Sequence, residues 1–186
     1  MISALLVLVP GAAIAAPPER PLYDLFQSLC VDTKANPELI RKALKVADFQ
    51  PHEHAMPPSG TPPMQLSGTD WDFNIGPRKF SLTAIHGVHP YGHTMFADSD
   101  ACSVVSWGED KASLVALNEW IGRKGDPGAF ARLNFTFDGS KLVPLPDDAS
   151  ISAAMMSGAS WSATLSDFGS GITATLDHLG VPYLRQ

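Results

Sequence analysis

Histidine is the residue type whose placement most suggests chemistry in this chain. Five of its six histidines fall in two neighbouring stretches, HEH and HGVHPYGH, as His52, His54, His86, His89 and His93. Imidazole nitrogens bind zinc and copper, and thioethers such as those of Met56 and Met64 select Cu(I). The pattern therefore suggests a zinc or copper site formed by His52, His54, His89 and His93.

A simpler interpretation competes with the metal site. The spacing matches no strong zinc motif such as HExxH, and histidines in loops are commonly just solvated. Strand alternation places His86 on the side of Phe80 and Leu82, which favours a histidine at the edge of the core. Metal binding is therefore the second hypothesis for this protein, behind a metal-free binding role.

Aspartates offer another candidate site, for a hydrolase or for a bound cation: Asp70, Asp72, Asp98, Asp100 and Asp110. Asp98-Ser99-Asp100 begins like an oxygen-ligand loop, but the Gly and Glu of a calcium loop do not follow at the required spacing. Asp70 and Asp72 alternate with apolar Trp71 and Phe73, which predicts that the two carboxylates coat the solvent face of a strand.

The sequence contains no strong motif for nucleophilic catalysis or nucleotide binding. A GxSxG elbow, a phosphate-binding loop and a dinucleotide glycine motif are all absent. We therefore assign no catalytic residue and keep an unrecognised hydrolase as an alternative. The tryptophans could line a ligand pocket, but their register with other apolar residues favours the core for Trp71, Trp107, Trp120 and Trp161.

The two cysteines, Cys30 and Cys102, have no others to pair with. Cys30 follows Leu22, Phe26 and other apolar residues at helical spacing, so it should face the core, and Cys102 opens the β-rich run ACSVVSW. In an oxidising compartment they would form one structural disulfide, worth about 4 kcal/mol on the chain-entropy model. Two unpaired buried thiols are the alternative.

The N-terminus has the features of a signal peptide. Residues 2–14 are almost wholly apolar, and Ala13-Ile14-Ala15 fits the small-x-small cleavage rule. We expect residues 1–15 to be removed and 16–186 to form a single domain, with a buried N-terminal strand or helix as the alternative. No other apolar run approaches the ~20 residues that span a bilayer.

These features predict a periplasmic or secreted protein without a membrane span in its mature form. The net charge of -6 and the lack of a basic run disfavour nucleic acid and anionic membranes as partners. A small ligand or another envelope protein is the expected partner.

Hydrophobic periodicity predicts an α+β fold, mainly an antiparallel sheet of about six to seven strands. An N-terminal helix pair comes first, its second helix capped by Asn36, and a proline-rich connection without regular structure spans Phe49 to Met64. One central helix begins at Glu109 or Asp110, and residues 149–157 form a short helix or loop.

Apolar residues that alternate with polar ones predict strands at 71–75, 80–84, 102–107, 133–137, 141–145, 161–165 and 172–176. A loop rich in Gly, His and Asp precedes the third of these.

The stretch FQSLCVDTKANPELIRKAL resembles the N-terminal region of small uncharacterised periplasmic proteins of alphaproteobacteria. The residues that carry the likeness are Phe26, Leu29, Cys30, Val31, Asp32, Thr33, Ala35, Asn36 and Pro37, with Cys102 completing it. The resemblance implies a periplasmic location and the disulfide, and it supplies no catalytic residue. The leading hypothesis is an exported α+β domain with a non-catalytic binding role.

Overall fold

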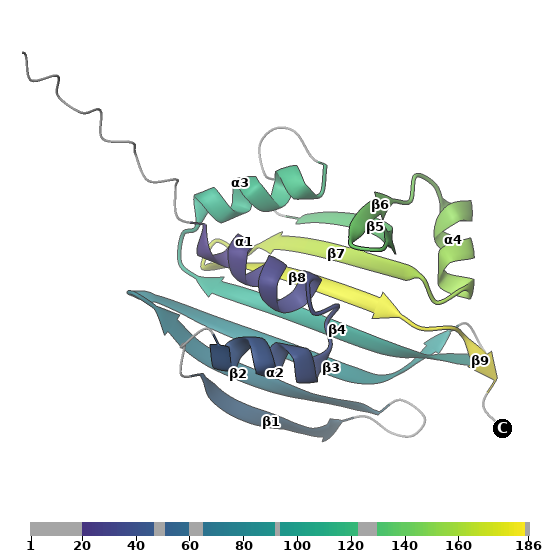
Figure 1. Cartoon of the computed structure of the whole chain (residues 1–186), viewed down its shortest axis with the longest axis horizontal. Helices are drawn as coiled ribbons and strands as arrows, with labels where there is room; N and C mark the ends of the chain where they lie inside the picture. The colour runs from purple at the N-terminus through teal and green to yellow at the C-terminus, as the bar shows by residue number, and fades with distance from the viewer. Residues whose placement is uncertain (1–19, 47–50, 60–64, 92–93, 123–129, 185–186) are drawn as a thin grey trace, which may run out of the picture.

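The computed structural model describes residues 20–46, 51–59, 65–91, 94–122 and 130–184. Within them a single antiparallel sheet carries most of the helices on one of its faces (Figure 1). The strands are β1 (His52–Ser59), β2 (Leu66–Ile75), β3 (Arg78–Tyr91), β4 (Met95–Trp107), β5 (Phe130–Asp138), β6 (Lys141–Pro144), β7 (Ser160–Asp167), β8 (Gly171–Leu179) and β9 (Tyr183–Leu184). The strand order is β1-β2-β3-β4-β8-β7-β5-β6, with β9 paired to β4 off this path.

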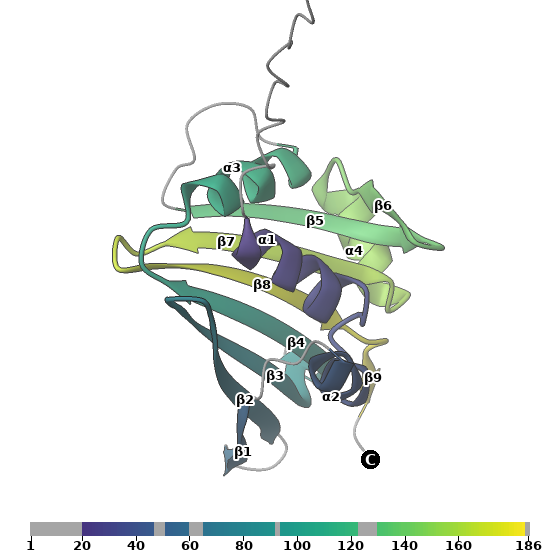
Figure 2. The same ribbon diagram turned by 60° about the vertical axis from the view of Figure 1, so that its left-hand side comes forward.

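The helices are α1 (Pro21–Leu25), the π-helix η1 (Phe26–Val31), α2 (Pro37–Val46), α3 (Lys111–Trp120) and α4 (Asp148–Met156). Figure 2 shows α1 and α2 in front of the sheet, whereas α4 lies behind β5. We call the side of the sheet that α1, η1 and α2 cover the helix face, and the opposite side the open face. None of the described helices is long and apolar enough to cross a membrane.

The core lies between the helix face and these helices. Trp71, Phe80 and Leu82 are almost fully buried, and so are Leu22 and Phe26 of the first helical segment. Because successive strand residues point to opposite faces, each strand supplies every second side chain to this core. The period-two pattern in the sequence therefore identified the helix face correctly.

A disulfide joins Cys30 of η1 to Cys102 of β4, as predicted. Both residues are fully buried, so the bridge fixes the first helical segment to the middle of the sheet. The bond closes a sequence separation of 72 residues. A loop of that length corresponds to about 4 kcal/mol on the chain-entropy model.

Asp110 connects three parts of the helix-covered side. Its carboxylate caps α3 by accepting from the backbone N–H and the hydroxyl of Ser113, at 3.2 and 2.8 Å. It also accepts from the backbone N–H of Leu22, at 3.3 Å, and pairs with the Arg78 guanidinium at 3.3 Å. A buried carboxylate with this many donors is well satisfied. The predicted start of the central helix is thus confirmed at Asp110, and Asn36 accepts from Glu38 and Leu39 at the start of α2.

The predicted number of strands is too low. The proline-rich connection contains β1, an edge strand that pairs with β2 and is irregular between Met56 and Ser59. Prolines fit there because an edge strand tolerates residues that donate no backbone hydrogen bond on its outer side. The expected Gly-, His- and Asp-rich loop before Cys102 is instead most of a long hairpin of β3 and β4.

The α+β class and the helix pair with a central helix are confirmed, and α4 adds a helix within the predicted helix-or-loop segment. Aspartate capping explains this addition, because Asp147 and Ser150 form a capping box at its start. The predicted signal peptide lies outside the described residues.

Candidate functional site

The open face is lined with hydroxyl and carboxyl groups. Thr83 donates to Asp70 and Ser81 donates to Asp72, each at 2.6 Å between neighbouring strands. The predicted placement of Asp70 and Asp72 on the solvent side of a strand is therefore correct. These carboxylates bind groups of the sheet itself, so most of this face is occupied by internal hydrogen bonds.

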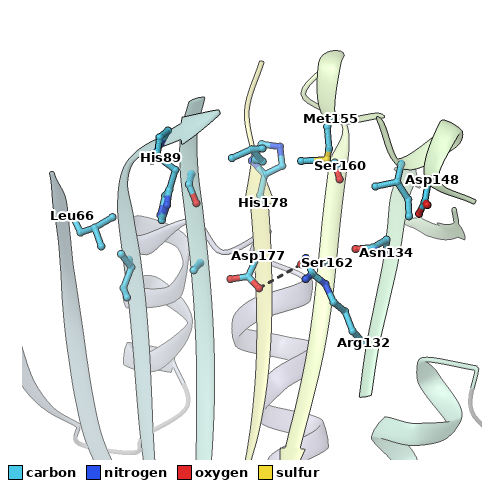
Figure 3. A pocket seen from close by; sticks show the side chains of 16 residues that line it. Leu66, His89, Arg132, Asn134, Asp148, Met155, Ser160, Ser162, Asp177 and His178 are labelled. Carbon is cyan, nitrogen blue, oxygen red and sulfur yellow. Dashed lines mark hydrogen bonds between the residues drawn. The ribbon is translucent and has the colours of Figure 1, made fainter. Parts of the chain in front are cut away.

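A cavity of about 880 Å³ opens on the same face. Strands β2, β3, β4, β8, β7 and β5 form its floor, and α4 forms part of its wall (Figure 3). The strand order explains its position, because β8 and β7 bring the C-terminal hairpin between β4 and β5. Residues from distant parts of the chain thus meet in one concave site.

One side of the cavity is largely apolar. Leu66 of β2, Ile85 of β3 and Ala101 of β4 line it, beside the polar side chains of His89 and Ser99. On the opposite side, α4 contributes the apolar Ile151 and Met155. Glycine permits the close packing of β2 against β3 here, because a Cβ on Gly87 would lie 2.5 Å from the carbonyl oxygen of Gln65. This side can bury the hydrocarbon part of a bound molecule.

The other side of the cavity carries a chain of polar groups across three strands. The Arg132 guanidinium on β5 donates to Ser162 of β7 at 3.3 Å, and Ser162 donates to Asp177 of β8 at 3.4 Å. Figure 3 shows these side chains directed into the site, beside Asn134. The hydrogen bonds are long, so the three groups remain available to a ligand.

Partial burial raises the pKa of the Asp177 carboxyl group. Arg132, the Ser162 hydroxyl and His89 favour the ionised form, but the loss of hydration outweighs them. The raised pKa indicates a carboxylate that the protein alone stabilises incompletely. Such groups are frequent at binding sites.

A second polar cluster lies at the same end of the sheet. His86, Asp100 and His178 stand directly opposite one another on β3, β4 and β8. The His86 Nδ1 lies 2.8 Å from one Asp100 oxygen, and the His178 Nδ1 lies 3.9 Å from the other. The prediction of His86 at the edge of the core agrees with this position, since His86 is exposed and follows the buried Ala84 on the same face of β3.

His178 is held on several sides. Its Nε2 lies 3.0 Å from the carbonyl oxygen of Gly158, and its ring stacks on Trp161 with centroids 4.3 Å apart. Asp100 raises the pKa of His178, assisted by Gly158, while His178 and then His86 lower the pKa of Asp100. The raised pKa favours the doubly protonated ring, whose Nε2 can donate to Gly158 while the charge faces Asp100. This cluster joins three strands at the rim of the cavity, which His178 also lines.

The predicted metal ligands are distributed over the sheet. His52 and His54 lie on edge strand β1, opposite Asp72 and Asp70, and His89 lines the cavity from β3. His93 and Met64 lie outside the described residues. Within the described part of the chain, no group of three or more His, Cys, Asp or Glu side chains could hold a metal ion. Zinc or copper binding stays an untested prediction.

The prediction that all four tryptophans belong to the core is confirmed in part. Trp71 and Trp161 are buried, and Trp120 packs against the core. Trp107 is different, because it is 50% exposed and donates its indole N–H to Ser81. All four are described residues and none lines the cavity.

Sequence reasoning missed Arg132, Ser162 and Asp177 as site residues. Their alternation with Leu133, Ala163 and Leu176 indicates a solvent-facing position, but not that they converge. Comparison of the chain with protein-family models, with curated proteins and with solved structures finds no match. The cavity itself is therefore the feature from which we infer a function.

Proposed function

We propose that this is an exported, disulfide-linked binding protein that holds a small amphipathic molecule in the cavity on its open face. The observation that carries the proposal is the cavity of about 880 Å³, which combines apolar side chains with a row of polar groups across β5, β7 and β8. Small-molecule sites commonly measure roughly 300–1,000 Å³ and combine apolar walls with a few placed polar groups. A concave site of this size favours a small ligand over a protein partner.

Two features support export. The disulfide suits an oxidising compartment outside the cytoplasm. The apolar N-terminal segment and its Ala-x-Ala sequence fit a cleaved signal peptide. Cell fractionation tests this part of the proposal: the full chain should reach the periplasm, and a chain without residues 1–15 should stay in the cytoplasm. Equal distribution of the two chains would contradict export.

Ligand binding can be tested by filling the cavity. Ala101 lies on β4 between Ile85 and Asp177 in the sheet register, so Ala101→Trp places a large ring in the site. Val105→Trp is the matched control, because Val105 lies on the same strand and face but does not line the cavity. The probe is N-phenyl-1-naphthylamine, an uncharged dye whose fluorescence rises in an apolar site.

The original protein and Val105→Trp should bind the dye alike, whereas Ala101→Trp should bind at least about tenfold more weakly, a difference of ~1.4 kcal/mol. Circular dichroism and thermal unfolding establish that both variants are folded. Undiminished dye binding by folded Ala101→Trp, or an absence of dye binding by the original protein, would contradict the proposed site.

A further inference from the structure

We propose that the ligand of this cavity is an amphipathic organic cation, a protonated amine or guanidinium group on an apolar body, whose charged head binds Asp177. The inference rests on the proposed binding function and adds the chemical class of the ligand. It follows from the partners of Asp177, from the charges of the cavity wall and from the position of the apolar side.

Asp177 has fewer partners than its burial requires. Its carboxylate accepts one long hydrogen bond, from Ser162 at 3.4 Å. None of the ion pairs among the described residues includes it. By contrast, the buried Asp110 carboxylate receives three hydrogen bonds and an arginine. Arg132 favours the ionised form of Asp177 without forming an ion pair with it. An ammonium or guanidinium group placed against Asp177 would supply the missing donors and a positive charge in direct contact.

The permanent charges on the cavity wall favour a cation. Asp177 and Asp148 contribute two carboxylates, and Arg132 contributes one guanidinium. His178 and His89 line the cavity as well, but the charge of His178 is offset by Asp100 at 3.9 Å, and His89 forms none of the ion pairs among the described residues. The whole chain carries a net charge of -6, which also attracts cations to the protein. Arg132 is exposed and therefore keeps its hydration, whereas Asp177 is partly buried and has lost part of its own. The larger gain from a bound counter-charge is thus at Asp177.

The apolar side lies within reach of the same carboxylate. Ala101 is the direct neighbour of Asp177 across β4 and β8, and Ile85 is the neighbour of Ala101 across β3 and β4. A hydrocarbon group attached to a cation at Asp177 can therefore extend over Ala101 and Ile85 toward Leu66. Each methylene buried there should improve affinity by up to about fourfold.

Three probes with the same hydrocarbon tail separate the possible head groups. Octylammonium is a cation, octanoate is an anion that Arg132 could bind, and 1-octanol is uncharged. Titration calorimetry at pH 7 measures their affinities for the original protein, Asp177→Asn and Asp70→Asn. Asp70→Asn is the matched control, since it removes the same charge from the open face at a residue that does not line the cavity.

Octylammonium should bind the original protein and Asp70→Asn at least about tenfold more tightly than 1-octanol. In the Asp177→Asn variant, the preference for octylammonium over 1-octanol should fall to about twofold or less. The affinity of this variant for 1-octanol should equal that of the original protein. Stronger binding of octanoate, or a cation preference that survives in Asp177→Asn, would overturn the inference. Equal binding of all three probes would overturn the cation but leave the binding function standing, and failure of every probe and of the dye would reject both.

Discussion

The two faces of the sheet differ in how completely their side chains are satisfied. On the helix face, Leu82 and Cys102 are fully buried under α1, η1 and α2, and Asp110 beneath the helices is surrounded by donors. On the open face, neighbouring residues of the same strands form polar pairs, and Asp177 is left with one long hydrogen bond. The residues that stabilise the fold and the residues that we propose bind a ligand are therefore divided between the faces of one set of strands.

This division follows from strand geometry. Adjacent residues such as Leu82 and Thr83 point to opposite sides, so each position serves one face only. Substitutions of neighbouring residues should therefore have different consequences: large losses of stability on the helix face, and small ones on the open face.

Removal of the disulfide should have the largest effect. The double variant Cys30→Ser, Cys102→Ser should lose about 4 kcal/mol of unfolding free energy, because its unfolded chain is no longer restricted by the closed loop. Urea denaturation followed by tryptophan fluorescence measures the loss. Reductant should destabilise the original protein to a similar degree and leave the double variant unchanged. A double variant as stable as the original protein would show that the bridge contributes nothing.

Leu82→Ala should cost about 3 kcal/mol, because it opens a cavity in the core beneath the helices. Its neighbour on the open face provides the matched variant. Thr83→Ala should cost only about 1 kcal/mol, the value of its hydrogen bond to Asp70. Both values come from urea denaturation. Equal losses would mean that the two faces do not differ in the way described.

Asp110→Ala should cost about 2–3 kcal/mol, because it removes the cap of α3 and leaves Arg78 and the Leu22 amide without their acceptor. Thermal unfolding should show a lower midpoint. The amides of α1 and α3 should both become less protected, because Asp110 contacts both helices. Amide hydrogen exchange can test the last point: faster exchange confined to α3 would contradict a link between the two helices.

The Asp100–His178 pair should give a smaller, pH-dependent contribution. The lowered pKa of Asp100 makes its contribution present above the ordinary carboxyl pKa of about 4 and lost as the pH falls through the lowered value. The raised pKa of His178 makes its contribution complete below about 6.5 and lost as the pH rises through the raised value. The pair should therefore stabilise most between about pH 4 and 6.5.

His178→Gln should remove this dependence, which we expect to be about 1 kcal/mol or less for a partly exposed pair. The unfolding free energy is measured at several pH values on either side of neutrality. His52→Gln is the control, since His52 is exposed on edge strand β1. An unchanged pH profile in His178→Gln would assign the dependence to groups other than His178.

Asp177→Asn should have the smallest effect on stability and the opposite sign. The raised pKa means that the fold disfavours the ionised carboxyl group, so a neutral amide should leave stability unchanged or raise it by up to about 0.5 kcal/mol at pH 7. Thermal unfolding without ligand measures the change. A loss of more than about 1 kcal/mol would make Asp177 a structural residue of the sheet, comparable with Asp110.

The helix face could be predicted from the sequence because its signals are local. Helical spacing placed Cys30 in the core, and capping residues placed the starts of α2 and α3. The strands at the edge of the sheet and at the end of the hairpin were harder to predict. β1 has exposed residues on both sides, and the outer part of the β3–β4 hairpin lacks the alternation of apolar and polar residues. Local pattern carries no information where burial is slight.

The cavity could not be predicted because it depends on strand order. Ala101 and Asp177 are direct neighbours only because β8 pairs with β4. Alternation showed that Asp177 faces away from Leu176, but the position of α4 beside it is a tertiary feature. The same limit explains why the histidines looked close in sequence, whereas His52 and His89 lie on different parts of the sheet.

We propose that the open face binds the ligand and that the helix face does not. A ¹H–¹⁵N NMR titration of the labelled protein with octylammonium tests this most directly. We expect saturable shifts at the amides of Ala101, Ser162 and Asp177, with little change in α1 and η1. Shifts centred on α1, η1 and α2, with Asp177 unaffected, would contradict it.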